Sequence, residues 1–195
     1  MPSYLVTGSS RGLGLGFVTE LETSRLLPGG LDNLVSSAGV NPNPLTSFED
    51  IEVKEFVDEV IFNLTTTLLL LREFVPLIRK SVSKKVLVIS SVLGSTELGA
   101  SMPNLQNAYS TAKAALNMMV RKWSAVLKDQ GITTVLLHPG TEVGSGIEEW
   151  MKTYAPNVPR QTIEECAESS MKVLAGITPK DNGLFYNYDG TKVPW

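Results

Sequence analysis

The sequence predicts an α/β fold, built as a doubly wound and mostly parallel sheet of about five strands. Short apolar runs typical of strands alternate along the chain with longer segments typical of helices. None of these runs shows a clean alternation of apolar and polar residues, so both faces of the sheet are expected to be covered. The 195 residues contain no internal repeat and no low-complexity linker, which favours a single domain over residues 1–195.

Five short, mainly apolar runs are the expected strands. They lie at residues 3–7, 31–35, 85–90, 132–137 and 184–187. The first strand ends at Gly8, and the second ends at a Ser-Ser-Ala-Gly turn over residues 36–39, because turn-forming residues interrupt extended structure.

Four longer segments are the expected helices. They lie at residues 13–25, 47–80, 107–129 and 164–174. A Pro-Gly-Gly sequence at residues 28–30 stops the first helix, and Gly131 stops the third. Ser47 is expected to cap the second, because its hydroxyl can accept a hydrogen bond from the first turn and acidic residues follow it.

Composition excludes several classes of protein. A formal net charge of −3 without a basic stripe argues against nucleic acid or an anionic membrane as partner. A single cysteine, Cys166, and a single histidine, His138, exclude an internal disulfide and a structural zinc site. The start of the chain lacks a signal-peptide pattern, and the most apolar stretch, residues 64–71, is short and contains threonines. These features predict a cytoplasmic protein with no membrane span.

A glycine-rich turn over residues 7–14 follows the first strand and opens the first helix. Glycines allow a tight turn and let a pyrophosphate approach backbone N–H groups at a helix N-terminus. The candidate cofactor-binding residues of this turn are Thr7, Gly8, Ser10, Arg11, Gly12, Leu13 and Gly14. The alternative is an ordinary glycine-rich strand–helix turn that binds nothing.

Tyr109 and Lys113 lie four residues apart and share one helix face, so the ammonium can lie near the phenol oxygen. A neighbouring cation favours the phenolate and lowers a phenol pKa of about 10. Such a phenol suits general acid/base chemistry on an alcohol or carbonyl oxygen. The alternative is a solvated helix face without chemistry.

Two further features carry candidate site residues. Ser90 and Ser91 end the third strand, and ligands bind at the carboxyl ends of parallel strands, where a hydroxyl can bond a substrate oxygen. The alternative for both serines is capping of the strand end. Asn63 lies inside an apolar helical run, where an unbonded amide would cost ~1–3 kcal/mol. Its alternative is a hydrogen bond to backbone with no catalytic part.

These four features, in this order, resemble the short-chain dehydrogenase/reductase family, whose signature is a Thr-Gly-x3-Gly-x-Gly turn and an Asn–Ser–Tyr–Lys tetrad. The tail over residues 183–195 looks like the C-factor-like, carbonyl-reductase-related branch, especially its fungal members. The resemblance implies a Rossmann-like sheet and an NAD(P)-dependent oxidoreductase that reduces a small carbonyl or oxidises an alcohol. Tyr109 would be the proton donor, and Ser91 would orient the carbonyl. Lys113 would bind the nicotinamide ribose and lower the Tyr109 pKa, and Asn63 would hold a water of a proton relay.

The resemblance also implies cofactor contacts, a lid and a partner. The further cofactor contacts are Ala38, Gly39, Tyr109, Lys113, Pro139 and Gly140. A basic residue at the position of Arg11 often accompanies a preference for NADP. Residues 141–161 would cover the substrate in an apolar pocket, and helices 47–80 and 107–129 would build a homodimer.

Local departures from the family pattern occur at two places. Ser36 and Ser37 stand where the family has two asparagines that stabilise the central sheet and the cofactor region. Glu142 and Gly144 stand where the family has a valine and then a threonine that anchors the nicotinamide amide.

The largest departure is the length of the nucleotide-binding half. Only one helix fits between the first two strands, so the family's second and third strands are expected to be missing between about residues 21 and 22. The family strand order 3-2-1-4-5-6-7 then becomes 1-4-5-6-7, and the strand at residues 3–7 becomes an edge. Asp32 lies within the next strand and is not expected to bind the adenosine ribose. Binding of NADP (or NAD) is therefore predicted to be weaker than is usual for the family.

Two other interpretations stay open. One is a catalytically impaired family remnant that acts as an interaction or regulatory protein. The other is a cofactor-independent lyase or isomerase that uses Tyr109 and Lys113 for proton transfer alone. Binding of NADPH and Tyr109-dependent turnover of a small carbonyl separate these interpretations from the reductase.

Overall fold

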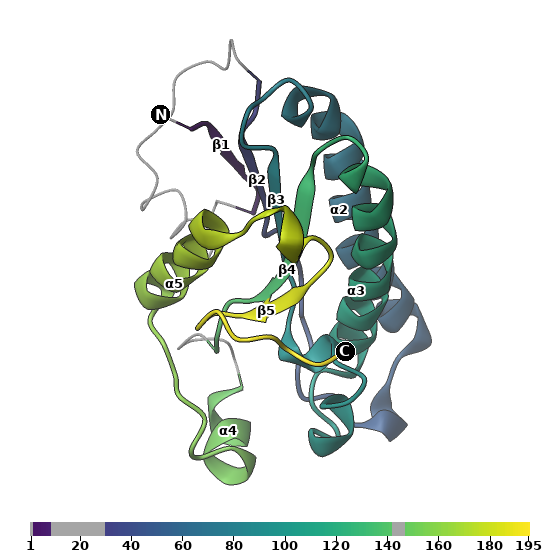
Figure 1. The fold of residues 1–195 in the computed structure, drawn as a ribbon. Coiled ribbons are helices and arrows are strands. Elements are labelled where there is room, and N and C mark those ends of the chain that lie inside the picture. Colours follow the sequence, from purple (N-terminus) through teal and green to yellow (C-terminus); the bar gives the residue numbers. More distant parts are fainter. Residues whose placement is uncertain (1, 9–29, 142–146) are drawn as a thin grey trace.

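The computed structural model describes residues 2–8, 30–141 and 147–195 (Figure 1). Within these residues, five parallel strands form one sheet in the order β1-β2-β3-β4-β5. The strands are β1 (Tyr4–Val6), β2 (Asn33–Ser36), β3 (Lys85–Ile89), β4 (Thr133–His138) and β5 (Phe185–Asn187). The predicted order is confirmed, and β1 is an edge of the described sheet. The helix expected at residues 13–25 lies outside the described residues.

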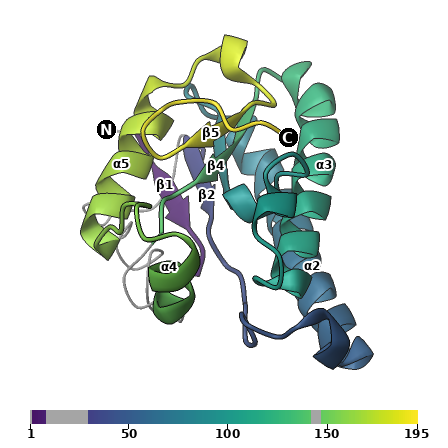
Figure 2. The same ribbon diagram turned by 90° about the horizontal axis from the view of Figure 1, so that it is seen from below.

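Helices cover both faces of the sheet. They are α2 (Val53–Ile78), α3 (Asn107–Lys128), α4 (Glu148–Tyr154) and α5 (Ile163–Gly176). Figures 1 and 2 show α2 and α3 on one face of the sheet and α5 on the other. The doubly wound α/β arrangement predicted from the sequence is therefore confirmed.

The core consists of two apolar layers, because successive side chains of a strand point to opposite faces. On one face Leu34, Val88 and Leu136 pack with residues of α2 and α3. On the other face, Leu87 and Leu137 pack with residues of α5. Each such fully buried leucine or valine stabilises the fold by about 1.5–3 kcal/mol relative to an exposed one. The layers hold the carboxyl ends of the strands in fixed positions relative to the helices.

Asp32 links the amino ends of the first three strands. Its carboxylate accepts hydrogen bonds from the backbone N–H groups of Ser3 (2.9 Å) and Ser83 (3.2 Å). This edge of the sheet is opposite to the carboxyl edge, so Asp32 plays a structural part, in line with its exclusion as the ribose ligand.

The start of α2 differs from the prediction. Ser47 does not cap this helix: its hydroxyl donates to Asp50 Oδ2 (2.6 Å), next to a 3₁₀ helix at Phe48–Asp50. The backbone is extended at Ile51 and Glu52, and Glu52 is the N-cap of α2, without a side-chain cap bond. Glu49 and Asp50, which were expected in the first turns of the long helix, therefore belong to a separate short turn.

The buried face of α2 changes character along the helix. Its buried residues recur every three or four positions, as one helix face requires: Glu59, Asn63, Thr67, Leu71, Val75 and Ile78. The first three are polar, and they lie towards the carboxyl edge of the sheet, where Thr67 Oγ1 lies 3.1 Å from Ser36 Oγ. The last three are apolar and belong to the core.

The whole of α2 is long and apolar enough to cross a membrane by length and composition alone. Core helices of globular domains meet the same criterion, and here α2 packs against α3 and β2. The expectation of no membrane span, drawn from residues 64–71 only, therefore stays a prediction.

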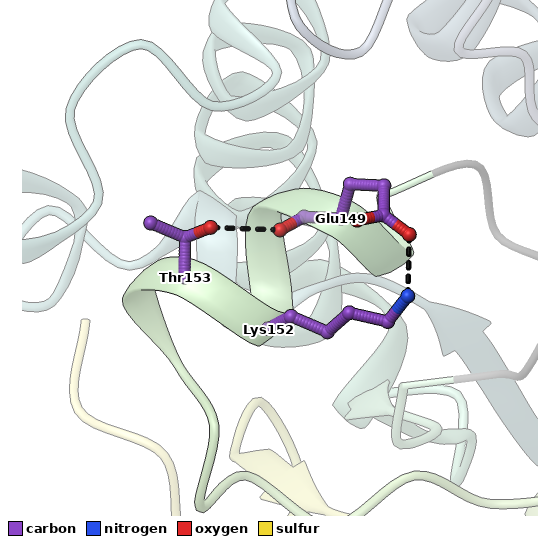
Figure 3. Close-up of polar contacts among 3 residues, drawn as sticks. All are labelled: Glu149, Lys152 and Thr153. Carbon is purple, nitrogen blue, oxygen red and sulfur yellow. Dashed lines mark hydrogen bonds and ion pairs between the residues drawn. The ribbon is translucent and has the colours of Figure 1, made fainter.

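A short helix, α4, lies in the region predicted to cover the substrate. Figure 3 shows the ion pair between Lys152 and Glu149 and the hydrogen bond from Thr153 Oγ1 to the Glu149 carbonyl oxygen (3.2 Å). Acidic residues in the first turn and Lys152 in the last turn suit the helix dipole. The seven-residue helix was not predicted, because it is too short to give a clear apolar periodicity.

Candidate active site

Tyr109 and Lys113 lie in the first two turns of α3, and the structure brings them together. Lys113 Nζ lies 5.2 Å from the centroid of the Tyr109 ring and donates a hydrogen bond to the Ile89 carbonyl oxygen (2.8 Å), at the carboxyl end of β3. Lys113 is only 4% exposed, and burial lowers its pKa from 10.5 to about 8. The alternative of a solvated helix face does not describe this pair.

Asn63 holds the chain shortly after β2 through hydrogen bonds to the backbone. Its Nδ2 donates to the carbonyl oxygens of Val40 and Glu59, each at 2.9 Å, and its Oδ1 accepts from the Val40 N–H at 3.1 Å. The Asn63 side chain therefore bonds to backbone, as the alternative interpretation of this residue required. The same bonds fix the position of Gly39, the neighbour of Val40.

Gly39 follows β2 and lies close to side chains of both α2 and α3. A Cβ at this position would lie 2.9 Å from Asn63 Oδ1 and 3.8 Å from Lys113 Nζ. Hydrogen bonds to backbone hold the Asn63 amide in place, so a residue with a Cβ at this position would press against Asn63 Oδ1. Asn63, Lys113 and Gly39 therefore form one cluster at the carboxyl ends of β2 and β3.

The two serines after β3 have different partners. Ser91 Oγ accepts a hydrogen bond from the Leu93 N–H (3.2 Å) and so caps the 3₁₀ helix at Val92–Gly94. Because a hydroxyl can accept and donate at once, Ser91 can cap this turn and still donate to a substrate oxygen. Ser90 Oγ lies 2.5 Å from Asn117 Oδ1, a buried contact between β3 and α3.

Asn117 and Gly94 are positioning residues that the sequence did not reveal. Asn117 Nδ2 donates to the Gly94 carbonyl oxygen (3.1 Å), so one side chain holds both the end of β3 and the turn after Ser91. A Cβ at Gly94 would lie 2.7 Å from the carbonyl carbon of Lys113, which means that this turn rests directly on α3. The available signal for Asn117 was its spacing, four residues after Lys113 on the same helix face.

Thr7 and Gly8 bring the glycine-rich turn to the same edge of the sheet. Gly8 has a φ of +71°, and a Cβ there would lie 2.9 Å from the backbone N and Cα of Ala38. Thr7 Oγ1 accepts from the Ser37 N–H at 3.3 Å. The other candidates of this turn, Ser10, Arg11, Gly12, Leu13 and Gly14, lie outside the described residues.

Pro139 and Gly140 follow β4 at the same edge. Gly140 has a φ of +101°, and the Gln161 side chain occupies the space that a Cβ would need. Glu142 and Gly144, the departures from the family pattern, lie outside the described residues. The described ends of β1, β2, β3 and β4 thus gather the predicted residues on one edge.

His138 and Cys166 are buried in the fold. Burial lowers the pKa of His138 to about 4, although Asp189 opposes this shift, so the imidazole is neutral near pH 7. Cys166 belongs to α5 and packs against the sheet. A concavity of about 450 Å³ lies between α5 and the end of the chain, and none of the predicted site residues lines it.

Comparison with known proteins decides the family. A family model described as short chain dehydrogenase matches residues 22–151. The chain belongs to the short-chain dehydrogenase family. The match begins at the position where the sequence predicted the missing strands, and it includes Asn63, Ser91, Tyr109 and Lys113.

Individual relatives support this membership. An uncharacterized oxidoreductase of Schizosaccharomyces pombe is 37% identical over 131 residues, which are 63% of this chain and 51% of that protein. C-signal of Myxococcus xanthus is 31% identical over 86% of this chain and 94% of its own. The chain spans about half the length of the first of these relatives.

The short-chain dehydrogenase srdF of Neurospora crassa covers all of this chain at 28% identity. That alignment extends over 228 positions against 195 residues, so the relative contains residues that this chain lacks.

Solved structures show the same fold. The NADPH-bound carbonyl reductase from chicken fatty liver has a TM-score of 0.83 at 25% identity, with 100% of this chain and 99% of that chain covered. Carbonyl reductase Sniffer of Drosophila melanogaster has a TM-score of 0.81 at 22% identity, with 100% of both chains covered.

Proposed function

We propose that the chain is an NADP-preferring oxidoreductase that reduces a small carbonyl or oxidises the corresponding alcohol, with Tyr109 as the acid/base. The observation that carries this proposal is the buried Lys113 ammonium, 5.2 Å from the centroid of the Tyr109 ring and beside Asn63 and Gly39. A cation held in such a position stabilises the phenolate that forms when Tyr109 gives up its proton.

The described residues fit a nicotinamide dinucleotide. The turn at Gly8 packs closely on the backbone of Ala38, and Gly39 lies beside Asn63 and Lys113, so both turns meet at the carboxyl edge of the sheet, where a dinucleotide binds. The hydrogen bond to Ile89 uses one of the three N–H donors of Lys113, so the ammonium can also donate to ribose hydroxyls. When bound, the cofactor supplies or accepts the hydride.

The chain's own residues handle the proton and the substrate oxygen. The Ser91 hydroxyl donates a hydrogen bond to the carbonyl oxygen, and the Tyr109 hydroxyl donates the proton to it. With a pKa of about 8, Lys113 is charged near pH 7 and can also release a proton, which suits a group that restores the Tyr109 proton. In the oxidation of an alcohol, the same groups act in reverse.

The substrate is proposed to be small and apolar around its carbonyl group. The half-buried Tyr109 packs against a cluster of buried apolar residues, and Trp150 of α4 packs against the same cluster. The cluster consists of Leu93, Leu105, Ile147 and Met151. A wall of this composition excludes water and offers few polar contacts beyond Ser91 and Tyr109.

We also propose weak cofactor binding, a homodimer and a cytoplasmic location. Weak cofactor binding is supported by the edge position of β1 in the described sheet, which leaves the adenine side without neighbouring strands there. A homodimer through α2 and α3 is supported by exposed apolar side chains on both helices, among them Ile61, Leu69 and Met118. A cytoplasmic location is supported by the cysteine content, because a single cysteine, Cys166, forms no internal disulfide.

Two measurements test the proposed function. Titration of the purified chain with NADPH, followed by cofactor fluorescence, is expected to show binding with a dissociation constant above the usual family range. A panel of small aldehydes and ketones is expected to give NADPH oxidation that Tyr109→Phe reduces by at least about a hundredfold, because general acid catalysis contributes about 10²–10⁴ in rate. Tyr188→Phe, at a tyrosine that lies outside the predicted site, serves as the matched control and should keep full activity.

Different outcomes separate the alternatives. A folded protein that neither binds NADPH nor turns over any carbonyl contradicts the reductase and favours the impaired remnant. Tyr109-dependent turnover without any dinucleotide favours the lyase or isomerase.

A further inference from the structure

A carboxyl group lies on the buried face of α2, close to the start of α3. Glu59 is 7% exposed, and its Oε1 has no hydrogen-bond partner among the described residues. Burial raises the pKa of the Glu59 carboxyl, because a charged carboxylate loses its hydration there. The same face becomes apolar three turns later, from Leu71 onwards, and a buried carboxylate without a partner costs stability, so an acidic residue is an unfavourable choice on grounds of stability alone.

Glu59 borders a small pocket of about 30 Å³ between the first turns of α2 and α3. A pocket of this size holds one or two water molecules, since one water needs about 10–15 Å³. Across from Glu59 the pocket is lined by Asn43, Thr46, Asn107 and Ala108. The other ionisable groups that face it, Glu52 and Glu55, come from α2, and Glu55 accepts a hydrogen bond from Asn43 Nδ2 at 3.0 Å.

The start of α3 has no capping side chain of its own. Its N-cap residue, Gln106, has a left-handed backbone (φ 54°, ψ 49°) and makes no side-chain cap bond. The first N–H groups of a helix have no acceptor within the helix, and they carry a partial positive charge that attracts anions. The Glu59 carboxyl and the water-sized pocket therefore lie where this helix end needs negative charge and hydrogen-bond acceptors.

The same turn of α3 carries Tyr109. Two described contacts hold this turn from outside the helix: the Gln106 N–H donates to the Pro44 carbonyl oxygen (2.7 Å), and Asn107 Nδ2 donates to the Thr46 carbonyl oxygen (3.0 Å). Glu59 of α2 lines the pocket beside this turn. Because Tyr109 follows Ala108 directly, a shift of this turn moves the phenol relative to Lys113 and Ser91.

We propose that Glu59 is a positioning residue for Tyr109: its carboxylate, acting through water in the pocket, holds the start of α3 and so fixes the turn that carries the phenol. Glu59 touches neither substrate nor cofactor in this role. The proposal rests on the proposed function only through the part played by Tyr109. It also explains why α2 keeps an acidic residue in a buried position, where an apolar one would be more stable.

Glu59→Gln tests this role, because it removes the charge and keeps the shape. Glu55→Gln, in the same pocket wall, is the matched control. The turnover number of Glu59→Gln is expected to fall about tenfold with little change in KM. A tenfold change in rate corresponds to about 1.4 kcal/mol, which lies within the range that an anion at a helix N-terminus contributes. Thermal stability near neutral pH is expected to stay level or rise, because a buried charge is removed. Parallel losses of stability and activity, or equal turnover in both variants, would overturn the proposal.

The pH dependence gives a second kinetic readout. As pH falls through the raised pKa of Glu59, the carboxylate takes up a proton and its hold on α3 weakens. The wild-type turnover number is therefore expected to fall on the acid side at a pH above the ordinary glutamate range, and Glu59→Gln should lack this limb. If Glu55→Gln removes the limb and Glu59→Gln keeps it, the proposal is wrong.

Amide hydrogen exchange tests the role of Glu59 without a measurement of enzyme activity. In the protein without cofactor, protection of the amides of residues 107–110 is expected to be about tenfold lower in Glu59→Gln than in wild type or Glu55→Gln. Wild-type protection should also fall at acid pH, a measurement that needs no variant. Equal protection throughout would overturn the inference. If Tyr109→Phe left turnover unchanged, the proposed function would fail instead, and the exchange result would still stand.

Discussion

Replacing Lys113 with methionine tests whether burial of the Lys113 ammonium lowers the free energy of unfolding. Lys113 is 4% exposed, and burial lowers its pKa from 10.5 to about 8. In the unfolded chain the lysine keeps its ordinary pKa. The folded and unfolded states therefore differ in how tightly they hold this proton, and the difference is a free energy of unfolding that depends on pH.

The magnitude follows from the pKa values. Each tenfold change in proton affinity corresponds to about 1.4 kcal/mol, so a fall from 10.5 to about 8 corresponds to about 3 kcal/mol. Near pH 7 the lysine is charged in both states, and the whole penalty is present. Between about pH 8 and about pH 10.5 the folded state binds fewer protons than the unfolded state, so this group makes the fold more stable as pH rises.

Urea unfolding at a series of pH values measures this effect. The free energy of unfolding of wild type, minus that of Lys113→Met, is expected to rise by about 3 kcal/mol from about pH 7 to about pH 10.5. Loss of the hydrogen bond to the Ile89 carbonyl oxygen shifts the variant by a constant amount and cancels from this slope. The same substitution at the exposed Lys122 is the control. A difference that is flat with pH would refute the burial of a charged Lys113.

Two further predictions concern the contacts that shape the site. Gly94→Ala is expected to destabilise the fold by about 1–3 kcal/mol, because the new Cβ would lie 2.7 Å from the Lys113 carbonyl carbon, and thermal unfolding beside Gly99→Ala, whose Cβ meets no atom within 4 Å, measures the loss. A Gly94→Ala protein as stable as Gly99→Ala would mean that the turn does not rest on α3. Asn63→Leu is expected to cost about 2–4 kcal/mol, because the N–H and carbonyl groups of Val40 lose their partners, and urea unfolding checks this value. A loss below about 1 kcal/mol would contradict the burial of these groups.

Most of the described fold could be predicted because it depends on local patterns. The apolar runs placed all five strands within about two residues of their observed ends, and the spacing of turn residues gave α3 and α5. The start of α2 could not be placed, because Ser47 and the acidic residues after it suit a 3₁₀ turn as well as a helical one. α4 is too short for a periodicity.

The identity of the candidate site residues could be predicted from the sequence, but most of the contacts between them could not. The spacing of Tyr109 and Lys113 indicated a shared face, but burial of Lys113 depends on β3 and Gly39, which are distant in sequence. The close approach of Gly94 to α3 depends in the same way on tertiary packing. Asn117 looked like an ordinary polar residue of a long helix. Such contacts appear only when the chain segments are placed in space.

Two buried ionisable groups, Lys113 and Glu59, lie near Asn63. Gly39 lies beside both Lys113 Nζ and Asn63 Oδ1, and the Glu59 carbonyl oxygen accepts a hydrogen bond from Asn63 Nδ2. Burial disfavours the charged form of both groups, so both cost stability near pH 7. The same helix face of α2 is apolar from Leu71 onwards, where it serves only the core. A fold selected for stability alone would continue that apolar stripe to the start of α2. The polar residues on this face are therefore best explained by the segments they hold in place: Asn63 holds the chain at Val40, and Glu59 holds the turn that carries Tyr109.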